Sequence, residues 1–253
     1  MSIKSKVLAS AATLTLVGGI ALTGALTAGS ASAATPSCGK FCINIFAKQF
    51  GTHKSPNFVV DVLRQGEKVN QPIILFRAAN YDPAEDFSLS YQGLASDFCA
   101  AGLVSALTCL HYGGGATLGK GTYPDLPAWE IEYAPYGVDS GLCLGVAEPA
   151  FNDEGVTLQP CGISGKTVWI GASPYSPVIP LGKYNVVING SNTNFSHPFV
   201  LTYPNNSYPT DMPRPQLTVQ NMTGFQEGYF PFLPVVGTVN SNQLWSATFG
   251  VLN

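Results

Sequence analysis

Two cysteines, Cys143 and Cys161, enclose the stretch CLGVAEPAFNDEGVTLQPC, and the run KTVWI follows at 166–170. The runs LCLGV, VTLQ and TVWI are short, rich in β-branched and aromatic residues, and separated by Gly, Pro, Asn or Asp, which is typical of strands. This pattern constrains the fold more than any other part of the chain, because it predicts a small β unit whose strands are tied by its own cysteines.

The N-terminus has the layout of a secretory signal peptide. Lys4 and Lys6 precede a long uncharged run, which ends in the small residues Ala31-Ser32-Ala33. A membrane anchor is the alternative, since the run is long enough to span a bilayer. We interpret residues 1–33 as a signal peptide cleaved after Ala33, and residues 34–253 as a secreted, extracellular protein.

The cysteine count agrees with export. All six cysteines lie after residue 33, and an even number in an oxidising compartment predicts disulfides. Zinc binding is the alternative, but the chain has no CxxC and its three histidines are far apart, so we expect no metal. Sequence order suggests three neighbouring pairs: Cys38–Cys42, Cys99–Cys109 and Cys143–Cys161.

The composition argues against several classes of partner. The formal charge of −3 becomes −5 once Lys4 and Lys6 are removed, and no basic cluster remains, so nucleic acid is not expected. No second apolar run of membrane length follows the signal. Few charged residues (11 %) with many glycines and prolines (27 and 19) fit a rigid extracellular β protein. We expect a monomer without a cofactor.

The rest of the exported chain consists of short β-rich runs and turns, and no helical pattern longer than two turns follows the signal. These units repeat at intervals of roughly 40 residues. The segments at 59 (VVDV) and 73 (IILFRA) align with CLGV at 143 and VTLQPC at 156. A middle copy is suggested from Cys99 through Cys109 to PAWEI, and a looser fourth copy runs from NVVI at 185 to NQLW at 242. The expected aromatic anchors are Phe87, Trp129 and Trp169, with Trp245 ambiguous.

This repeat resembles that of ricin-type β-trefoil lectins, whose unit pairs a Cys-Leu-Asp-Val strand with a later half-cystine and closes with Gln-x-Trp. CLGV…LQPC…TVW keeps both cysteines and the tryptophan, and NQLW at 242–245 keeps the closing motif. The resemblance implies that the units pack their aromatic residues into one core about a pseudo-threefold axis. In the first copy Val59 and Ala78 stand at the two half-cystine positions, so an apolar pair is expected there in place of a disulfide.

We therefore expect an all-β fold, β-trefoil-like with a C-terminal β elaboration. A four-bladed propeller and two packed β domains are the alternatives. The expected organisation is a disulfide-closed segment at 34–55, trefoil-like repeats at 56–175, and a looser fourth repeat or C-terminal β extension at 176–253.

The resemblance also implies where a sugar would bind. Ricin-type sites use the Asp of the first strand, an aromatic residue two positions before the second half-cystine, and Asn or Gln at the closing motif. Carried over to the first copy, these are Asp61, Phe76 and, in place of Gln, Glu85, with Asn80 nearby. A turn-stabilising role is the alternative for Asp61.

Other candidate motifs are weaker. Residues 114–121 nearly spell a P-loop, but Gly121 stands where Ser or Thr should be. Glu130 and Glu132 alternate on one strand, and we expect them on a solvated face rather than as catalytic carboxylates. The sequence therefore predicts a secreted, non-catalytic carbohydrate-binding protein, with a polysaccharide or cell-wall glycan as partner. A secreted hydrolase such as a glycosidase, and a structural or protease-inhibitor trefoil, are the alternatives.

Overall fold

The computed structural model describes residues 42–52, 55–79, 82–113, 125–172, 184–204, 215–223 and 239–249. Residues 35–253 form one unit, and everything below refers to it. No helix in the described ranges is both long and apolar enough to cross a membrane. Several predicted features lie outside the described residues: the signal peptide, Cys38, Asn80 and the P-loop-like motif at 114–121.

Six antiparallel strands form a closed ring. They are β1 (Ile43–Ala47), β6 (Phe87–Leu94), β7 (Pro127–Tyr133), β10 (Val168–Ala172), β11 (Val186–Asn189) and β14 (Trp245–Phe249). Each strand pairs with the next, and β14 pairs with β1. Asn185 and Trp245 close the ring between β11 and β14 with two backbone hydrogen bonds of 2.8 Å. Such a ring is a barrel, not the separate blades of a propeller.

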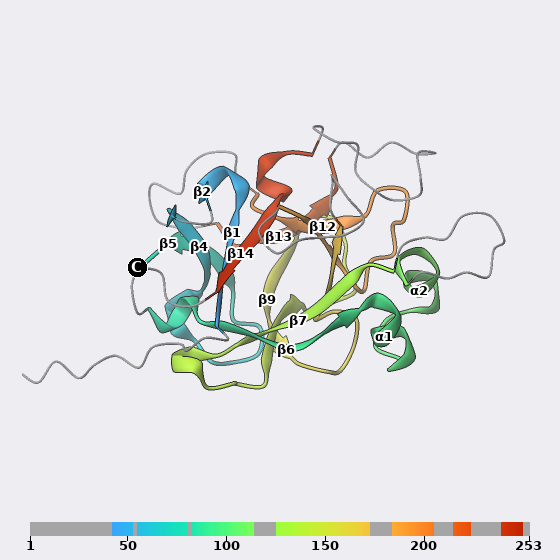
Figure 1. Cartoon of the computed structure of the whole chain (residues 1–253), viewed down its shortest axis with the longest axis horizontal. Helices are drawn as coiled ribbons and strands as arrows, with labels where there is room; N and C mark the ends of the chain where they lie inside the picture. Colours follow the sequence, from blue (N-terminus) through green and yellow to red (C-terminus); the bar gives the residue numbers. More distant parts are fainter. Residues whose placement is uncertain are drawn as a thin grey trace, which may run out of the picture. The chain divides into compact units, whose positions relative to one another are not determined.

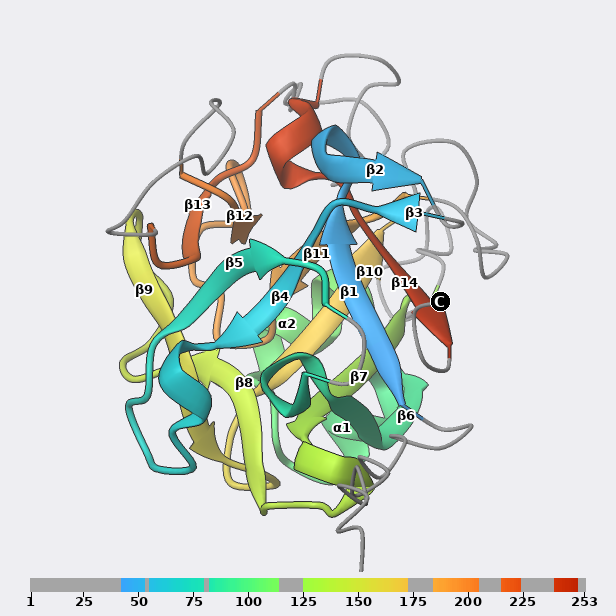
Figure 2. The same cartoon turned by 90° about the vertical axis from the view of Figure 1, so that its left-hand side faces the viewer.

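Three hairpins cover one end of this barrel. They are β4 (Phe58–Val62) with β5 (Ile73–Arg77), β8 (Leu142–Val146) with β9 (Glu154–Pro160), and β12 (Phe199–Thr202) with β13 (Thr218–Asn221). Figure 2 shows β4 and β5 beside β1. The second strands of the hairpins meet one another: Leu217 N–H donates to Ile73 O at 2.8 Å, and Val156 N–H donates to Leu217 O at 2.7 Å.

Barrel strand, hairpin and barrel strand therefore follow one another three times, which is the β-trefoil arrangement. We call these repeats unit 1 (β1, β4, β5, β6), unit 2 (β7 to β10) and unit 3 (β11 to β14). The C-terminal segment, expected as a looser repeat or an extension, supplies the whole of unit 3. Short 3-10 turns and a two-stranded ribbon complete the described elements: η1 (Lys48–Phe50), β2 (Gly51–Thr52), β3 (Ser55–Pro56), η2 (Leu63–Gln65), η3 (Pro83–Glu85), η5 (Pro135–Gly137) and η6 (Ser241–Gln243).

The middle copy suggested by the sequence is wrong, because the segment around Cys99 and Cys109 is helical. It forms α1 (Ala95–Ala100) and α2 (Ala106–Tyr112), inserted between β6 and β7 and visible at their ends in Figure 1. The expected Cys99–Cys109 disulfide is present, but it joins these two helices instead of two strands. Ser105 caps α2 by accepting the Thr108 N–H at 3.1 Å.

The second expected disulfide, Cys143–Cys161, is present and ties the hairpin of unit 2. Strand pairing places Val59 opposite Phe76, Cys143 opposite Gln159 and Val200 opposite Gln220. Two positions after these partners come Ala78, Cys161 and Met222, so apolar pairs stand at the half-cystine positions of units 1 and 3. Cys42 is also disulfide-bonded, and its predicted partner Cys38 is outside the described residues.

The core aromatic residues are Phe87, Trp169 and Trp245, each at or next to the start of its unit's last strand and at most 2 % exposed. Trp169 Nε1–H donates to Leu144 O at 2.8 Å, and Trp245 Nε1–H donates to Leu201 O at 2.7 Å. Trp129 is not the third member of this set. It lies on β7 opposite Trp169 and is partly exposed.

Candidate functional site

The threefold equivalence defines three comparable sites. The acid position is the third residue of the strand motif that begins at Cys143 in unit 2. It is Asp61 in unit 1, Gly145 in unit 2 and Thr202 in unit 3. The closing position lies two residues before the core aromatic residue. It is Glu85 in unit 1, Thr167 in unit 2 and Gln243 in unit 3. At the aromatic position on the second hairpin strand stand Phe76, Gln159 and Gln220.

In unit 3 the site is satisfied internally. Gln243 Oε1 accepts the backbone N–H of Thr223 at 2.8 Å. Its Nε2 donates to Thr202 Oγ1 at 3.1 Å and to Asn221 O at 3.0 Å. Gln220 donates to Asp153 Oδ1 at 2.6 Å. These bonds give Gln243 a structural role at the closing position.

In unit 2 the backbone leaves no space for an acid. A Cβ on Gly145 would lie 2.9 Å from Lys166 O and 3.0 Å from Thr167 Cγ2. Gln159 is held by Asn70 Oδ1 at 2.7 Å and Thr157 Oγ1 at 2.8 Å. Unit 2 therefore has neither an acid nor an aromatic ring at the two positions that Asp61 and Phe76 occupy in unit 1.

The expectation of a solvated face for Glu130 and Glu132 is wrong, because both are buried (4 % and 6 % exposed). Glu130 Oε1 accepts Gly162 N–H at 2.8 Å and Thr167 Oγ1–H at 2.6 Å. The short side chain of Thr167 thus leaves room for Glu130, from the neighbouring strand β7, to supply the acceptor oxygen. The spacing of residues in the sequence gave no sign that Glu130 would take the place of the closing residue as acceptor.

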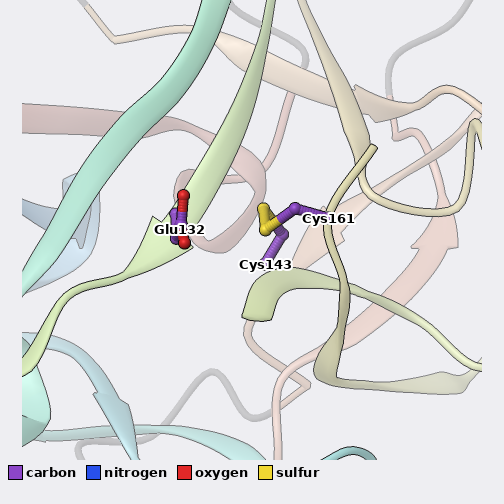
Figure 3. A group of neighbouring side chains, drawn as sticks. All are labelled: Glu132, Cys143 and Cys161. Atoms are coloured by element: carbon purple, nitrogen blue, oxygen red, sulfur yellow. A yellow bond between two sulfur atoms is a disulfide. The ribbon is translucent and has the colours of Figure 1, made fainter. Parts of the chain in front are cut away.

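Glu132 lies beside the Cys143–Cys161 disulfide (Figure 3). Its Oε1 accepts Gly141 N–H at 2.6 Å, and burial raises the pKa of its carboxyl. The carboxyl oxygen and the two sulfurs lie within 4.8 Å of one another. The sulfurs are bonded to each other, so they are not thiolate ligands, and this group does not form a metal site in the structure.

Unit 1 alone has acids at both the acid and the closing position. Asp61 and Glu85 are 4 % and 2 % exposed, and their acidic oxygens lie within 4.8 Å of each other and of that of Asp82. Asp82 also caps η3 by accepting Ala84 N–H at 3.0 Å. Asp82 was missed as a member of this group, although its position before Pro83 is typical of a helical N-cap.

The electrostatics of this group follow from its burial. Loss of water raises the pKa of Glu85 to about 8, and the negative charges of Asp82, Asp61 and Asp86 act in the same direction. The Ala79 N–H, donated to Glu85 Oε1 at 2.8 Å, partly opposes this shift. Burial likewise raises the pKa of Asp86 to about 6. Burial and the neighbouring negative charges thus both favour the protonated form of the Glu85 carboxyl.

The structure brings Asp61 and Glu85 together, and strand pairing puts Phe76 on the same hairpin face as Asp61. Asp61 pairs with Ile74, and Phe76 is two residues further along the same strand, so both side chains point to one side. Phe76 is partly exposed, whereas Asp61 is buried.

No family model matches the sequence, and no curated protein matches it either. Among solved structures, the designed threefold-symmetric protein ThreeFoil is 13 % identical, with a TM-score of 0.47, over 82 % of this chain and 97 % of that chain. The Rhizoctonia solani agglutinin is 13 % identical, with a TM-score of 0.45, over 83 % of this chain and 96 % of that chain. An exo-β-1,3-galactanase from Clostridium thermocellum is 12 % identical, with a TM-score of 0.46, over 83 % of this chain but 30 % of that chain. These likenesses are weak, and it is the strand pairing that makes this chain an all-β, trefoil-like protein.

Proposed function

We propose that this is a secreted, non-catalytic carbohydrate-binding protein whose sugar site is in unit 1. The observation that carries the proposal is the difference among the three equivalent sites. Only unit 1 combines a carboxyl group at the acid position with an aromatic ring at the neighbouring position, Asp61 with Phe76. One carboxylate can accept bonds from two sugar hydroxyls, and bonds to charged acceptors are the stronger ones.

Export is part of this proposal. The Cys99–Cys109 and Cys143–Cys161 disulfides support an oxidising location, as expected for the chain that follows a signal peptide. The ligand proposed is a polysaccharide or cell-wall glycan, and the protein is proposed to bind it as a monomer.

The geometry of unit 1 does not favour the glycosidase alternative. Glycosidases place two carboxyl groups roughly 5 to 9 Å apart, on either side of the scissile bond. Here the acidic oxygens of Asp61, Asp82 and Glu85 lie within 4.8 Å of one another, and two of the three side chains are almost fully buried. These separations are shorter than the range found in glycosidases.

A glycan-array screen of the secreted protein tests the proposal. We expect weak binding, with a Kd of about 1 mM, or about 4 kcal/mol, because Phe is a smaller stacking surface than Trp. Asp61→Asn and Phe76→Ala should each remove the signal, whereas Gln220→Ala, the matched change in unit 3, should not. An array without any signal would reject the proposal, and equal loss in all three variants would reject this site.

A further inference from the structure

Glu85 and Gln243 hold one backbone amide in the same way. Glu85 Oε1 accepts the N–H of Ala79, and Gln243 Oε1 accepts the N–H of Thr223, both at 2.8 Å. Ala79 and Thr223 are each the second residue after the hairpin strand of their unit. One oxygen of Glu85 therefore takes the place of the amide oxygen of Gln243.

The second polar atom of each side chain has a different chemistry. Gln243 Nε2 is a donor, and it donates to Thr202 Oγ1 at the acid position of unit 3. The residue at the acid position of unit 1 is Asp61, whose acidic oxygen lies within 4.8 Å of that of Glu85. A carboxyl group can replace a donating amide only when it carries a proton. Two ionised carboxylates at this distance, away from water, would repel each other.

We propose that Glu85 is a positioning residue that retains its proton and shares it with Asp61, so that the pair carries one negative charge and Asp61 is held for the ligand. Glu85 thus acts through Asp61 and does not touch the ligand. The part of this inference that concerns the ligand rests on the proposed function, whereas the shared proton rests on the fold alone.

The surroundings of the pair favour the protonated form. The charges that act on Glu85, those of Asp82, Asp61 and Asp86, are all negative, and burial adds to their effect. Burial raises the pKa of the Tyr133 hydroxyl on β7, and Tyr133 is also close enough to Asp61 and Glu67 for their negative charges to raise it. The other titratable groups on the turns packed against η3 are Arg64 of η2 and Tyr136 of η5.

The shared proton is tested without any ligand. Carbon-13 NMR of the Glu side chains across a pH series should show one carboxyl, absent in Glu85→Gln, that titrates well above the ordinary range of glutamates. The pKa of Glu85 is higher in the folded than in the unfolded state. Its contribution to the free energy of unfolding is therefore present at low pH and is lost as the pH rises from about 4.5 through about 8. Glu85→Gln restores the amide found in unit 3 and should remove this part of the pH dependence. Glu148→Gln, at an exposed position, is the control, and this variant should keep the pH dependence of the wild type. A normal Glu85 pKa, or a pH profile unchanged in Glu85→Gln, would overturn the proposal.

The positioning role is tested on the glycan array at pH 7 and pH 9. The signal of the wild type should fall about tenfold at pH 9, one unit above the pKa, if only the protonated pair binds. Glu85→Gln should bind equally at both values. An equal fall in both proteins, or no fall in the wild type, would overturn the positioning role. An array without signal at either pH would reject the proposed function and the positioning role together, and the NMR titration would still decide on the shared proton.

Discussion

Trp169 and Trp245 occupy the same place in units 2 and 3 and make the same hydrogen bond. Each donates its Nε1–H to a backbone carbonyl on the first hairpin strand of its own unit, at 2.8 Å and 2.7 Å. Phe87 takes this place in unit 1 without a polar atom. The last barrel strand of units 2 and 3 is therefore joined to the hairpin by a directed bond as well as by packing.

The first prediction concerns this bond. Trp169→Phe and Trp245→Phe should each destabilise the protein by about 1–3 kcal/mol, because a buried carbonyl loses its donor and the ring loses volume. Denaturant unfolding measures the difference. Trp129→Phe, on a partly exposed side chain, is the control and should cost less. A larger loss in the control would contradict the assignment of the core aromatic residues.

The second prediction concerns the hairpin of unit 2. Replacing Cys143 and Cys161 by Ala should cost on the order of 3 kcal/mol, by the loop-entropy estimate for a loop of this length. The double variant Cys143→Val with Cys161→Met copies the Val200 and Met222 pair of unit 3, so it should recover part of this loss by packing. If it recovered nothing in thermal unfolding, the equivalence of the two pairs would be wrong.

The third prediction concerns Glu130. Glu130→Ala should cost about 1–3 kcal/mol, because the N–H of Gly162 and the hydroxyl of Thr167 lose their acceptor in a buried place. Glu130→Gln keeps an acceptor oxygen and should cost less. Denaturant unfolding of both variants measures the two losses of stability. Equal losses in Glu130→Ala and Glu130→Gln would show that the site needs the charge of Glu130 and not its hydrogen bonds.

The fourth prediction concerns pH and Asp86, which accepts the N–H of Tyr136 at 3.0 Å. Its folded-state pKa of about 6 lies above the ordinary value of 3.8, mainly because of burial. Its contribution to stability is therefore present at low pH and is lost as the pH rises from about 4 to about 6, with a slope of at most ~1.4 kcal/mol per pH unit. Asp86→Asn should flatten the unfolding profile in this window only. An unchanged profile would mean that Asp86 titrates normally.

The sequence by itself determined the type of unit. The Cys143–Cys161 pair, the aligned VVDV and IILFRA strands and the Gln-x-Trp motif of NQLW were recognisable because each depends on residues close together within one repeat. These local signals were sufficient for the trefoil-like fold, for one disulfide within a hairpin, and for the apolar pair Val59 and Ala78.

Only the tertiary structure decided which segments count as units and which side chain fills each site. The segment of α1 and α2 resembled a repeat because Cys99, Cys109 and Trp129 have suitable spacing. Helices of six and seven residues are also too short to show a clear periodicity in the sequence. Glu130 supplies the oxygen that Thr167 cannot, and it comes from a strand nearly 40 residues earlier in the chain. Asp61 and Glu85 become a buried pair only when the hairpin closes over the barrel, since burial and charge are properties of the packed neighbours and not of the local sequence.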